Sequence, residues 1–207
     1  MELTYYGANC VRLAAKKAQI VVDDNLKALG LKDVTKPTDI SLRTSQSFAE
    51  HEAAFRAEMP GEYEVSGVVI RGIAARAHMD EEGKHSATIY TIQADDTKVV
   101  VLGHIFPELT EDQLESIGIV DVAIVPVGGM GYTLDGIGAL NVIKQIEPKV
   151  VIPTHYSDKA ISYEVPQAAL ADAVKSLGME VSETLGKYKI KPSELSDSTK
   201  LIVLERQ

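Results

Sequence analysis

Three apolar runs in the second half of the chain constrain its fold more than any other feature. The runs KVVVLG, DVAIVPVGG and KVVIPTH begin at residues 98, 121 and 149. The first does not alternate polar with apolar residues, which is typical of a strand covered on both faces. The second also reads as a buried strand, and the third as the next strand along. This half of the chain is therefore expected to form strand–helix units around a buried sheet.

Three helices are expected beside these strands. A capping box, TEDQ, and a following glycine predict a short helix over residues 111–117. Over residues 135–146, apolar side chains recur at spacing three on one helical face, at positions 137, 140, 143 and 146, and a proline follows. Residues 165–178 carry a proline near their start and a glycine at their end, which predicts a third helix.

The first half of the chain reads as short strands. The expected strands cover residues 3–7, 10–15, 17–25, 38–44 and 61–77, a hairpin over 86–104, and a last strand over 201–206. No linker-like segment or internal repeat divides the sequence. We therefore expect a single α/β domain over residues 1–207, with helices covering a pair of packed sheets.

Charge and cysteine content exclude several classes of protein. The net charge is −9, so broad binding to nucleic acid or to an anionic membrane is not expected. The single cysteine, Cys10, allows no internal disulfide and is expected to be a small core residue. The sequence shows neither a signal-peptide pattern nor a run of about 18 apolar residues. A cytoplasmic location, away from membranes, is the expectation.

Three of the five histidines follow predicted strands. His78, His104 and His155 each stand where a strand ends, and loops at such ends commonly carry the ligand sites of α/β folds. Three histidines and a water can complete a catalytic zinc site. The alternative is that each is a separate surface or core histidine. His51 and His85 lie in polar contexts and are expected to be solvated.

Two other segments could contribute to a site. The glycine-rich run PVGGMGY, residues 126–132, could bind an anion through its backbone amides, although a tight turn is the favoured interpretation. The adjacent acids Asp23 and Asp24 are either paired site residues or a solvated strand end. No G-x-S-x-G motif of a serine hydrolase is present.

Taken in order, several segments resemble the metallo-β-lactamase-fold superfamily. The similarity is with small bacterial zinc-dependent hydrolases related to ascorbate-6-phosphate lactonase. It rests on MELTYYGANCVRL, QIVVDDNL, PGEYEVSGVVIRGI, HMDEEG, ATIYTIQADDTKVVVLGH, DVAIVPVGGMGYTLD and KVVIPTHY, which cover nearly the whole chain. The resemblance implies an αββα sandwich of two packed mixed sheets flanked by helices. It also places the site at the sheet edges, in the cleft between the two halves.

The metal-binding motif of that family is replaced in this chain. Where the family carries His-x-His-x-Asp-His, alignment of the segments places Ser45, Ser47, Ala49 and Glu50. The bridging aspartate position is occupied by His104. Elsewhere, Ala8 stands at the opening histidine position, whereas Asp23, His78 and His155 match the family. A dinuclear site needs about three protein ligands per metal, so the usual two-metal hydrolysis is not expected.

Three functions remain open at this point. The first is a non-catalytic relative without a metal cofactor, which binds a small molecule or a protein through its cleft. The second is a hydrolase with one zinc on a rearranged His78, His104 and His155 site, with Glu50 as fourth ligand or general base. The third is metal-free acid–base chemistry by a histidine with Glu50 or Asp24. The resemblance also raises the expectation of a homo-oligomer. The residues expected to line the cleft are Asp23, Asp24, Ser45, Ser47, Gly129 and Tyr156.

Overall fold

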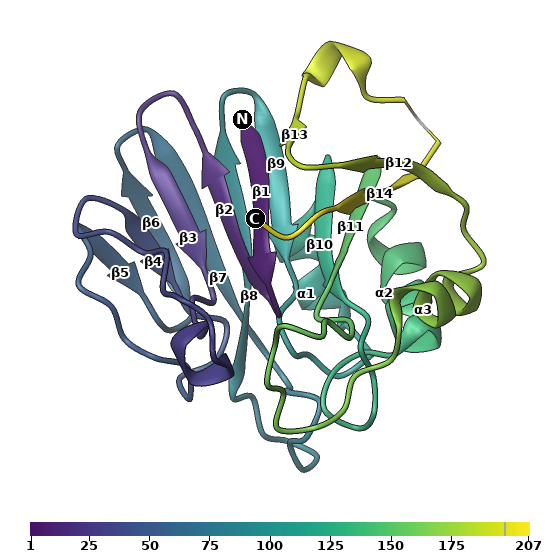
Figure 1. Cartoon of the computed structure of the whole chain (residues 1–207). Helices are drawn as coiled ribbons and strands as arrows, with labels where there is room; N and C mark the ends of the chain where they lie inside the picture. Colours follow the sequence, from purple (N-terminus) through teal and green to yellow (C-terminus); the bar gives the residue numbers. More distant parts are fainter. Residues whose placement is uncertain (197) are drawn as a thin grey trace.

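Two mixed β-sheets packed face to face form the body of the molecule (Figure 1). The structure is a computed structural model, and it describes residues 1–196 and 198–207. One sheet has six strands in the order β13-β1-β2-β3-β4-β5, and the other has eight in the order β12-β14-β11-β10-β9-β8-β7-β6. The expected sandwich of two mixed sheets flanked by helices is confirmed.

The strands of both sheets are short. The six-stranded sheet consists of β1 (Glu2–Gly7), β2 (Cys10–Ala14), β3 (Gln19–Val22), β4 (Ile40–Leu42), β5 (Phe55–Ala57) and β13 (Tyr188–Lys189). The eight-stranded sheet consists of β6 (Gly61–Val65), β7 (Val68–Ala75), β8 (Ala87–Ala94), β9 (Thr97–Val101), β10 (Val122–Pro126), β11 (Val150–Thr154), β12 (Val181–Leu185) and β14 (Lys200–Leu204).

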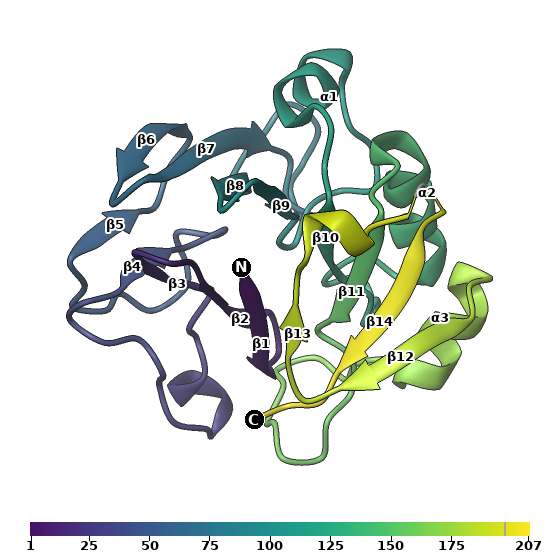
Figure 2. The ribbon, with the colours of Figure 1, turned by 90° about the horizontal axis from the view of Figure 1, so that it is seen from above.

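The α-helices gather on the outer face of the eight-stranded sheet (Figure 2). They are α1 (Glu111–Ile117), α2 (Gly136–Ile146) and α3 (Leu170–Leu177). Two 3₁₀ helices complete the described structure: η1 (Lys27–Leu29), which follows β3 of the other sheet, and η2 (Pro192–Glu194). The eight-stranded sheet is therefore covered on both sides, by the second sheet and by the α-helices.

This double covering explains the apolar runs of the second half. Val99 and Val101 of β9 point into the core between the sheets, whereas Val100 points into the core under the helices. In β10, Ile124 faces the first core and Val125 the second. Because both faces of these strands are buried, neither face has room for polar side chains. Cys10 is also fully buried, as expected.

The capping box at the start of α1 is confirmed. The hydroxyl of Thr110 accepts a hydrogen bond from the backbone N–H of Gln113, and the Gln113 side chain accepts one from the backbone N–H of Thr110, at 3.2 and 2.9 Å. In α2, the Asp135 side chain accepts from the N–H of Gly138 at 2.7 Å. Both helices therefore begin where a side chain satisfies backbone donors that lack partners within the helix.

Two helix predictions need correction. The third helix begins at Leu170, five residues later than predicted, because the preceding segment is held by other backbone groups. Within it, the N–H of Ala168 donates to Gly128 and its carbonyl accepts from Ser157. In α2, Ile137 is 62% exposed, and the buried face is formed by Ala139, Val142, Ile143 and Ile146.

The strands β5, β12 and β13 were not anticipated from the sequence. β12 is an edge strand whose side chains are mostly exposed, so it has no buried apolar face to produce a periodic signal. β13 has two residues and pairs with β1 through Glu2 and Leu3. Such short or exposed strands are formed by their neighbours more than by their own residue pattern.

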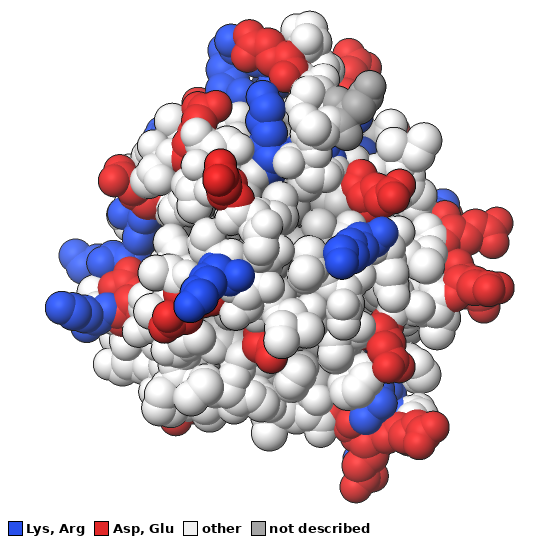
Figure 3. All heavy atoms as spheres, turned by 90° about the vertical axis from the view of Figure 1, so that its right-hand side faces the viewer, with Lys and Arg blue, Asp and Glu red and all other residues white. Residues whose placement is uncertain are grey.

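The face that carries the C-terminal part of the chain has a mixed surface charge (Figure 3). On the part of this face that the structure describes, Lys and Arg are interspersed with Asp and Glu and form no continuous basic patch. None of the helices in the described residues combines the length and the apolar character needed to cross a membrane.

Candidate functional site

A cleft opens where loops following strands of both sheets meet. The strands β9, β10 and β11 are parallel neighbours, as are β3 and β4 in the other sheet, so their carboxyl ends share one edge (lower edge in Figure 1). Asp23, Phe48, His104, Tyr132 and His155 come from the loops at this edge and line one cavity. This is the location that the resemblance implies.

His104 separates two hollows in this cleft. One has about 490 Å³ of empty space, which includes space open to solvent, and is also lined by His155 and Tyr163. The other has about 470 Å³, likewise partly open to solvent, and is also lined by His78, Ser45 and Ser47. The other two strand-end histidines, His155 and His78, therefore line different hollows, and His104 lines both.

The His104 ring is packed among other rings. Its centroid lies 4.5 Å from that of His155, 4.9 Å from that of Tyr132 and 5.5 Å from that of Phe48, all with edge-on geometry. Its Nε2 atom is buried and has no hydrogen-bond partner. Burial, together with the neighbouring His155 and His78, holds the pKa of His104 well below its usual range, so the ring is neutral near pH 7.

His155 is fixed by both its backbone and its ring. Its backbone is left-handed, with φ of 55°, and its N–H donates to the carbonyl of Ala8 at 2.7 Å. The ring Nδ1 lies 3.1 Å from Oε1 of Gln167. Because that oxygen only accepts, Nδ1 carries the proton and Nε2 keeps its lone pair. Burial lowers the pKa of His155 to about 4, so this ring is also neutral near pH 7.

Asp23 connects the two sheets beneath the cavity. Its carboxylate accepts hydrogen bonds from the backbone and hydroxyl of Thr44, both at 2.7 Å, and from the amide of Asn9 at 2.6 Å. The Asn9 side chain in turn accepts from the hydroxyl of Thr154, at the end of β11. Burial raises the pKa of Asp23 to about 6, although these donors oppose the shift. Asp23 is among the residues that line the cavity.

The loop after β4 carries no strong metal ligands toward the cleft. The hydroxyls of Ser45 and Ser47 lie 2.8 Å apart and hydrogen-bond to each other. Glu50 is 62% exposed, and its carboxylate lies 3.4 Å from Arg43 and 3.6 Å from Arg56. Glu50 lines neither hollow beside His104, which leaves it poorly placed for the catalytic role considered above.

Arg43 explains the direction that this loop takes. Its side chain is buried, and its guanidinium donates to the carbonyl of Phe48 at 2.6 Å and pairs with Glu58 at the same distance. Phe48 is thereby held with its ring against His104, while the next residues turn outward. The sequence pattern did not indicate that Arg43 is buried or that it sets the direction of the loop.

His78 borders the second hollow but stays apart from His155. Its backbone N–H donates to the carbonyl of His104 at 2.7 Å, and its ring lies near Phe106, with 6.2 Å between centroids. Its Nδ1 is buried without a partner.

The described residues contain one group of three potential ligand atoms within 4.8 Å of one another, and this group consists of Asp24, Asp33 and His51. His78, His104 and His155 do not form such a group, so a single zinc on these three would need a rearrangement.

Other expected site residues have structural roles outside the cleft. Asp24 accepts hydrogen bonds from Val34 and Thr35 on the far side of the strand end. The Tyr156 hydroxyl donates to the carbonyl of Leu204, and burial raises its pKa to about 12. Gly129, with φ of 66°, belongs to a turn in which its own N–H donates to Leu134, so its amide is not free for an anion.

The two remaining histidines differ from each other. His85 is exposed, as expected. His51 is not solvated, because its Nε2 lies 2.6 Å from the backbone carbonyl of Asp24 and its side chain is 13% exposed. The sequence reading also missed Asn9, Tyr132, Tyr163 and Gln167 as residues of the cleft. Of these, Tyr132 lay at the end of the glycine-rich run and Asn9 lay within MELTYYGANCVRL, but neither was expected to be a site residue.

The charge inside the cleft is neutral to negative. The hollow beside His155 is lined by the acids Asp23 and Glu164. In the described part of the chain, no Lys or Arg is among its lining residues. The cleft histidines also lack a carboxylate partner among the described side chains, since the hydrogen-bonding partner of His155 is the amide of Gln167. The His–carboxylate pair needed for the metal-free reaction is therefore not observed there.

Comparison with known proteins agrees with this architecture. A family model described as the Beta-lactamase superfamily domain matches residues 2–155. A Thermotoga maritima structure, assigned to the Zn-dependent hydrolases of the metallo-beta-lactamase superfamily, is 26% identical with a TM-score of 0.76, over 99% of this chain and 98% of that one. Igni18, a metallo hydrolase of the archaeon Ignicoccus hospitalis, is 20% identical with a TM-score of 0.60, over 92% of this chain and 99% of its own.

A curated relative matches over a shorter stretch. A metal-dependent hydrolase of Nanoarchaeum equitans is 36% identical over 70 residues, which is 32% of this chain and 32% of that protein. The aligned stretch thus spans about a third of that relative.

Proposed function

This chain belongs to the beta-lactamase superfamily, and we propose that it no longer carries out two-metal hydrolysis. Instead, it binds a small, flat, uncharged or cationic molecule in its cleft. The observation that carries the proposal is the loop after β4. At the positions of four metal ligands in the family, this loop has Ser45 and Ser47, whose hydroxyls hydrogen-bond to each other, together with Ala49 and Glu50. The Glu50 side chain turns outward to Arg43 and Arg56. Serine is a poor zinc ligand and alanine is none.

The donors that remain do not fit a pair of metals. His104 replaces the bridging aspartate, and an imidazole suits one metal better than a bridge between two. Asp23 has both oxygens engaged by Asn9 and Thr44. The residues present therefore do not fit a dinuclear metal cofactor.

The lining of the cavity supports the proposed ligand class. Phe48, Tyr132 and Tyr163 offer ring surfaces around the neutral imidazoles of His104 and His155. Rings of this kind favour a planar ligand, which can stack or meet their edges. With two acids and no Lys or Arg in the described lining, a phosphate or carboxylate ligand would be repelled, whereas a cation would be attracted.

The test of the proposed ligand class is a binding measurement. The chain has no Trp, so tyrosine fluorescence and ligand-observed NMR can report binding of imidazole, pyridinium and neutral heteroaromatic probes, with inorganic phosphate and acetate as comparisons. We expect heteroaromatic probes to bind and Tyr132→Leu to weaken that binding, while the exposed Glu115→Gln has no effect. Preferential binding of the anions would overturn the ligand class.

A second candidate is a hydrolase with one zinc held by His104 and other cleft histidines. The observation that favours it is that His78 Nδ1 and His104 Nε2 are both buried without partners. Elemental analysis and lactone or phosphodiester hydrolysis assays with added Zn²⁺ separate the two candidates. A stoichiometric metal and an activity that both disappear in His104→Ala would establish the hydrolase and contradict the proposed binding function.

A further inference from the structure

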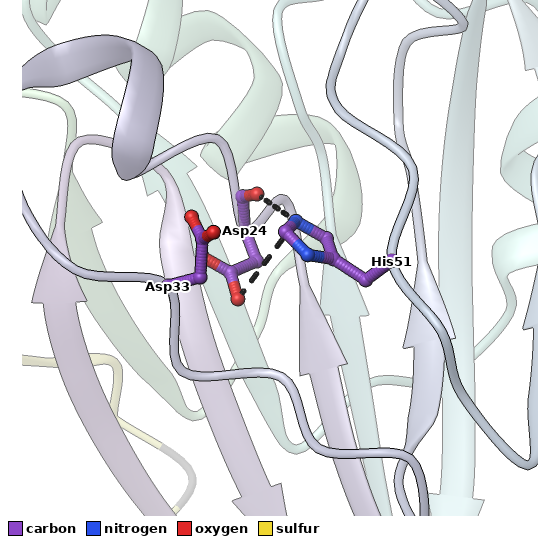
Figure 4. Close-up of side chains that lie close together, drawn as sticks. All are labelled: Asp24, Asp33 and His51. Carbon is purple, nitrogen blue, oxygen red and sulfur yellow. Dashed lines mark hydrogen bonds and ion pairs between the residues drawn. The ribbon is translucent and has the colours of Figure 1, made fainter.

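A separate group of potential metal ligands lies outside the cleft. Asp24 follows β3, Asp33 follows η1, and His51 lies in the loop before β5, and Figure 4 shows their side chains converging with Asp24 in the middle. One ligand atom from each residue lies within 4.8 Å of the others. Three segments of the chain therefore meet at this point.

Asp24 carries an unsatisfied oxygen into this group. The residue is 4% exposed, and its Oδ2 accepts three hydrogen bonds, from the N–H groups of Val34 and Thr35 and from the Thr35 hydroxyl, at 2.6 to 2.8 Å. Its Oδ1 is buried and has no partner. In Figure 4, Oδ2 faces His51 and the other oxygen lies on the side of Asp33. A buried carboxylate oxygen without a partner is uncommon and calls for an explanation such as an ion.

The described side chains do not neutralise this pair of acids. Neither Asp24 nor Asp33 forms an ion pair with a Lys or Arg among them, and Asp33 accepts only the backbone N–H of Lys27 at 3.1 Å. The nearest basic group is His51, with Nε2 3.9 Å from Oδ2 of Asp24. Two carboxylates beside one imidazole thus lack a matching positive charge, which a bound cation would supply.

We propose that Asp24, Asp33 and His51 bind one divalent transition-metal ion, with Zn²⁺ as the representative. Because Nε2 of His51 donates to the backbone carbonyl of Asp24 at 2.6 Å, the imidazole would have to bind the ion through Nδ1. One imidazole nitrogen and two carboxylate oxygens form a ligand set that Zn²⁺ accepts, with water in the fourth position, whereas an all-oxygen shell would be expected for Ca²⁺. The ion would join the end of β3 to the segment after η1 and to the loop before β5. Its role is structural, because Asp24 points away from the cleft that Asp23 enters.

The role of the ion in supporting the cleft follows from the sequence order. Asp23 and Asp24 are adjacent, and Asp23 is held from the cleft side by Thr44 and Asn9. An ion on Asp24 would fix the same strand end from the opposite side. Loss of the ion should therefore loosen this strand end without removing any residue of the cleft.

The test is calorimetric titration of metal-free full-length protein with Zn²⁺, checked by elemental analysis after dialysis. We expect one equivalent of Zn²⁺ in the wild type and in His104→Ala, and at least a tenfold weaker affinity in Asp33→Asn and in His51→Gln. Asp33 is exposed, so Asp33→Asn should fold. Glu81→Gln, which removes an exposed acid elsewhere, serves as the matched control.

Thermal unfolding provides a second measurement. Zn²⁺ should raise the unfolding temperature of the wild type and of Glu81→Gln but not that of Asp33→Asn. Several results would overturn the proposal: no zinc bound at micromolar concentration, equal binding by Asp33→Asn, or binding of Ca²⁺ in preference to Zn²⁺. Zinc that is lost in His104→Ala and kept in Asp33→Asn would place the ion in the cleft, and would contradict this proposal as well.

Discussion

Thr44 donates two hydrogen bonds to the carboxylate of Asp23, one from its backbone N–H to Oδ1 and one from its hydroxyl to Oδ2, both at 2.7 Å. The two residues follow the parallel neighbours β3 and β4, so these bonds fix the start of the loop that carries Ser45 and Ser47. The loop is therefore held in place by residues that are not themselves metal ligands. The loop can therefore keep its position even where its metal ligands have been replaced.

Removal of the Asp23 carboxylate should destabilise the fold. In Asp23→Ala, buried donors of Thr44 and Asn9 lose their acceptor, which should lower the free energy of unfolding by about 3 kcal/mol. Thr44→Val removes one hydroxyl donor and should cost about 1 kcal/mol. Urea unfolding at pH 7 measures both, and the exposed Glu52→Ala should stay within about 0.5 kcal/mol of the wild type. An Asp23→Ala protein as stable as Glu52→Ala would contradict the buried network.

The cleft should also make stability depend on pH in two opposite ways. Between about pH 4 and 6, unfolding lets His155 gain a proton, because its pKa of about 4 in the folded state rises to about 6.5. Over the same range Asp23 loses a proton on unfolding, because its pKa falls from about 6 to about 3.9. His155 therefore makes stability rise with pH, whereas Asp23 makes it fall.

Variants separate these two contributions. Asp23→Asn should steepen the rise of unfolding free energy with pH by about 1.4 kcal/mol per pH unit between pH 4 and 6, and His155→Gln should reduce it by a similar amount. Urea unfolding in EDTA at several pH values checks the signs without interference from metals. A shallower dependence in Asp23→Asn than in the wild type would show that its carboxyl is not protonated in the folded state.

Restoration of the family motif should restore metal binding in the cleft only in part. The quadruple variant Ser45→His, Ser47→His, Ala49→Asp and Glu50→His would supply the missing loop ligands. With His104 still at the bridging position, we expect one additional equivalent of Zn²⁺ by elemental analysis. Addition of His104→Asp should allow a second, because a carboxylate can bridge two metals. The quadruple variant without any additional zinc would indicate that Arg43 and Phe48 hold the loop in an unsuitable conformation.

The capping box of α1 gives a local test of the fold. Thr110→Ala removes the hydroxyl that accepts from Gln113 and should lower the free energy of unfolding by about 1 kcal/mol. Thr110→Ser keeps the acceptor and should be close to the wild type. Chemical denaturation of the two variants side by side measures the difference, and equal stability would mean that the cap contributes nothing.

Features with a local physical cause could be predicted from the sequence. The fully apolar run around Val100 predicted a strand covered on both faces, and the capping box predicted α1. The approach of His104 and His155 to within 4.5 Å between ring centroids follows from their places at the ends of strands at one sheet edge.

Features that depend on distant side chains could not be predicted. Glu50 was proposed for the site, but the buried Arg43 and the neighbouring Arg56 draw it outward. The contact between His51 and the carbonyl of Asp24 joins residues 27 positions apart, and no local periodicity reports it. Hydrogen bonding to Gly128 and Ser157 delayed the start of α3, although the sequence before it contains good helix formers.

The pairing of β1 with β13 has a consequence for synthesis of the protein. Glu2 and Leu3 find their partners at Lys189 and Tyr188, and Tyr5 forms a bridge with Arg206. On the ribosome, the edge of the six-stranded sheet stays open while the intervening residues are made, so closure of this sheet comes late in translation. Until then β1 presents unpaired backbone groups to other nascent chains, and a chaperone that shields this edge would limit aggregation.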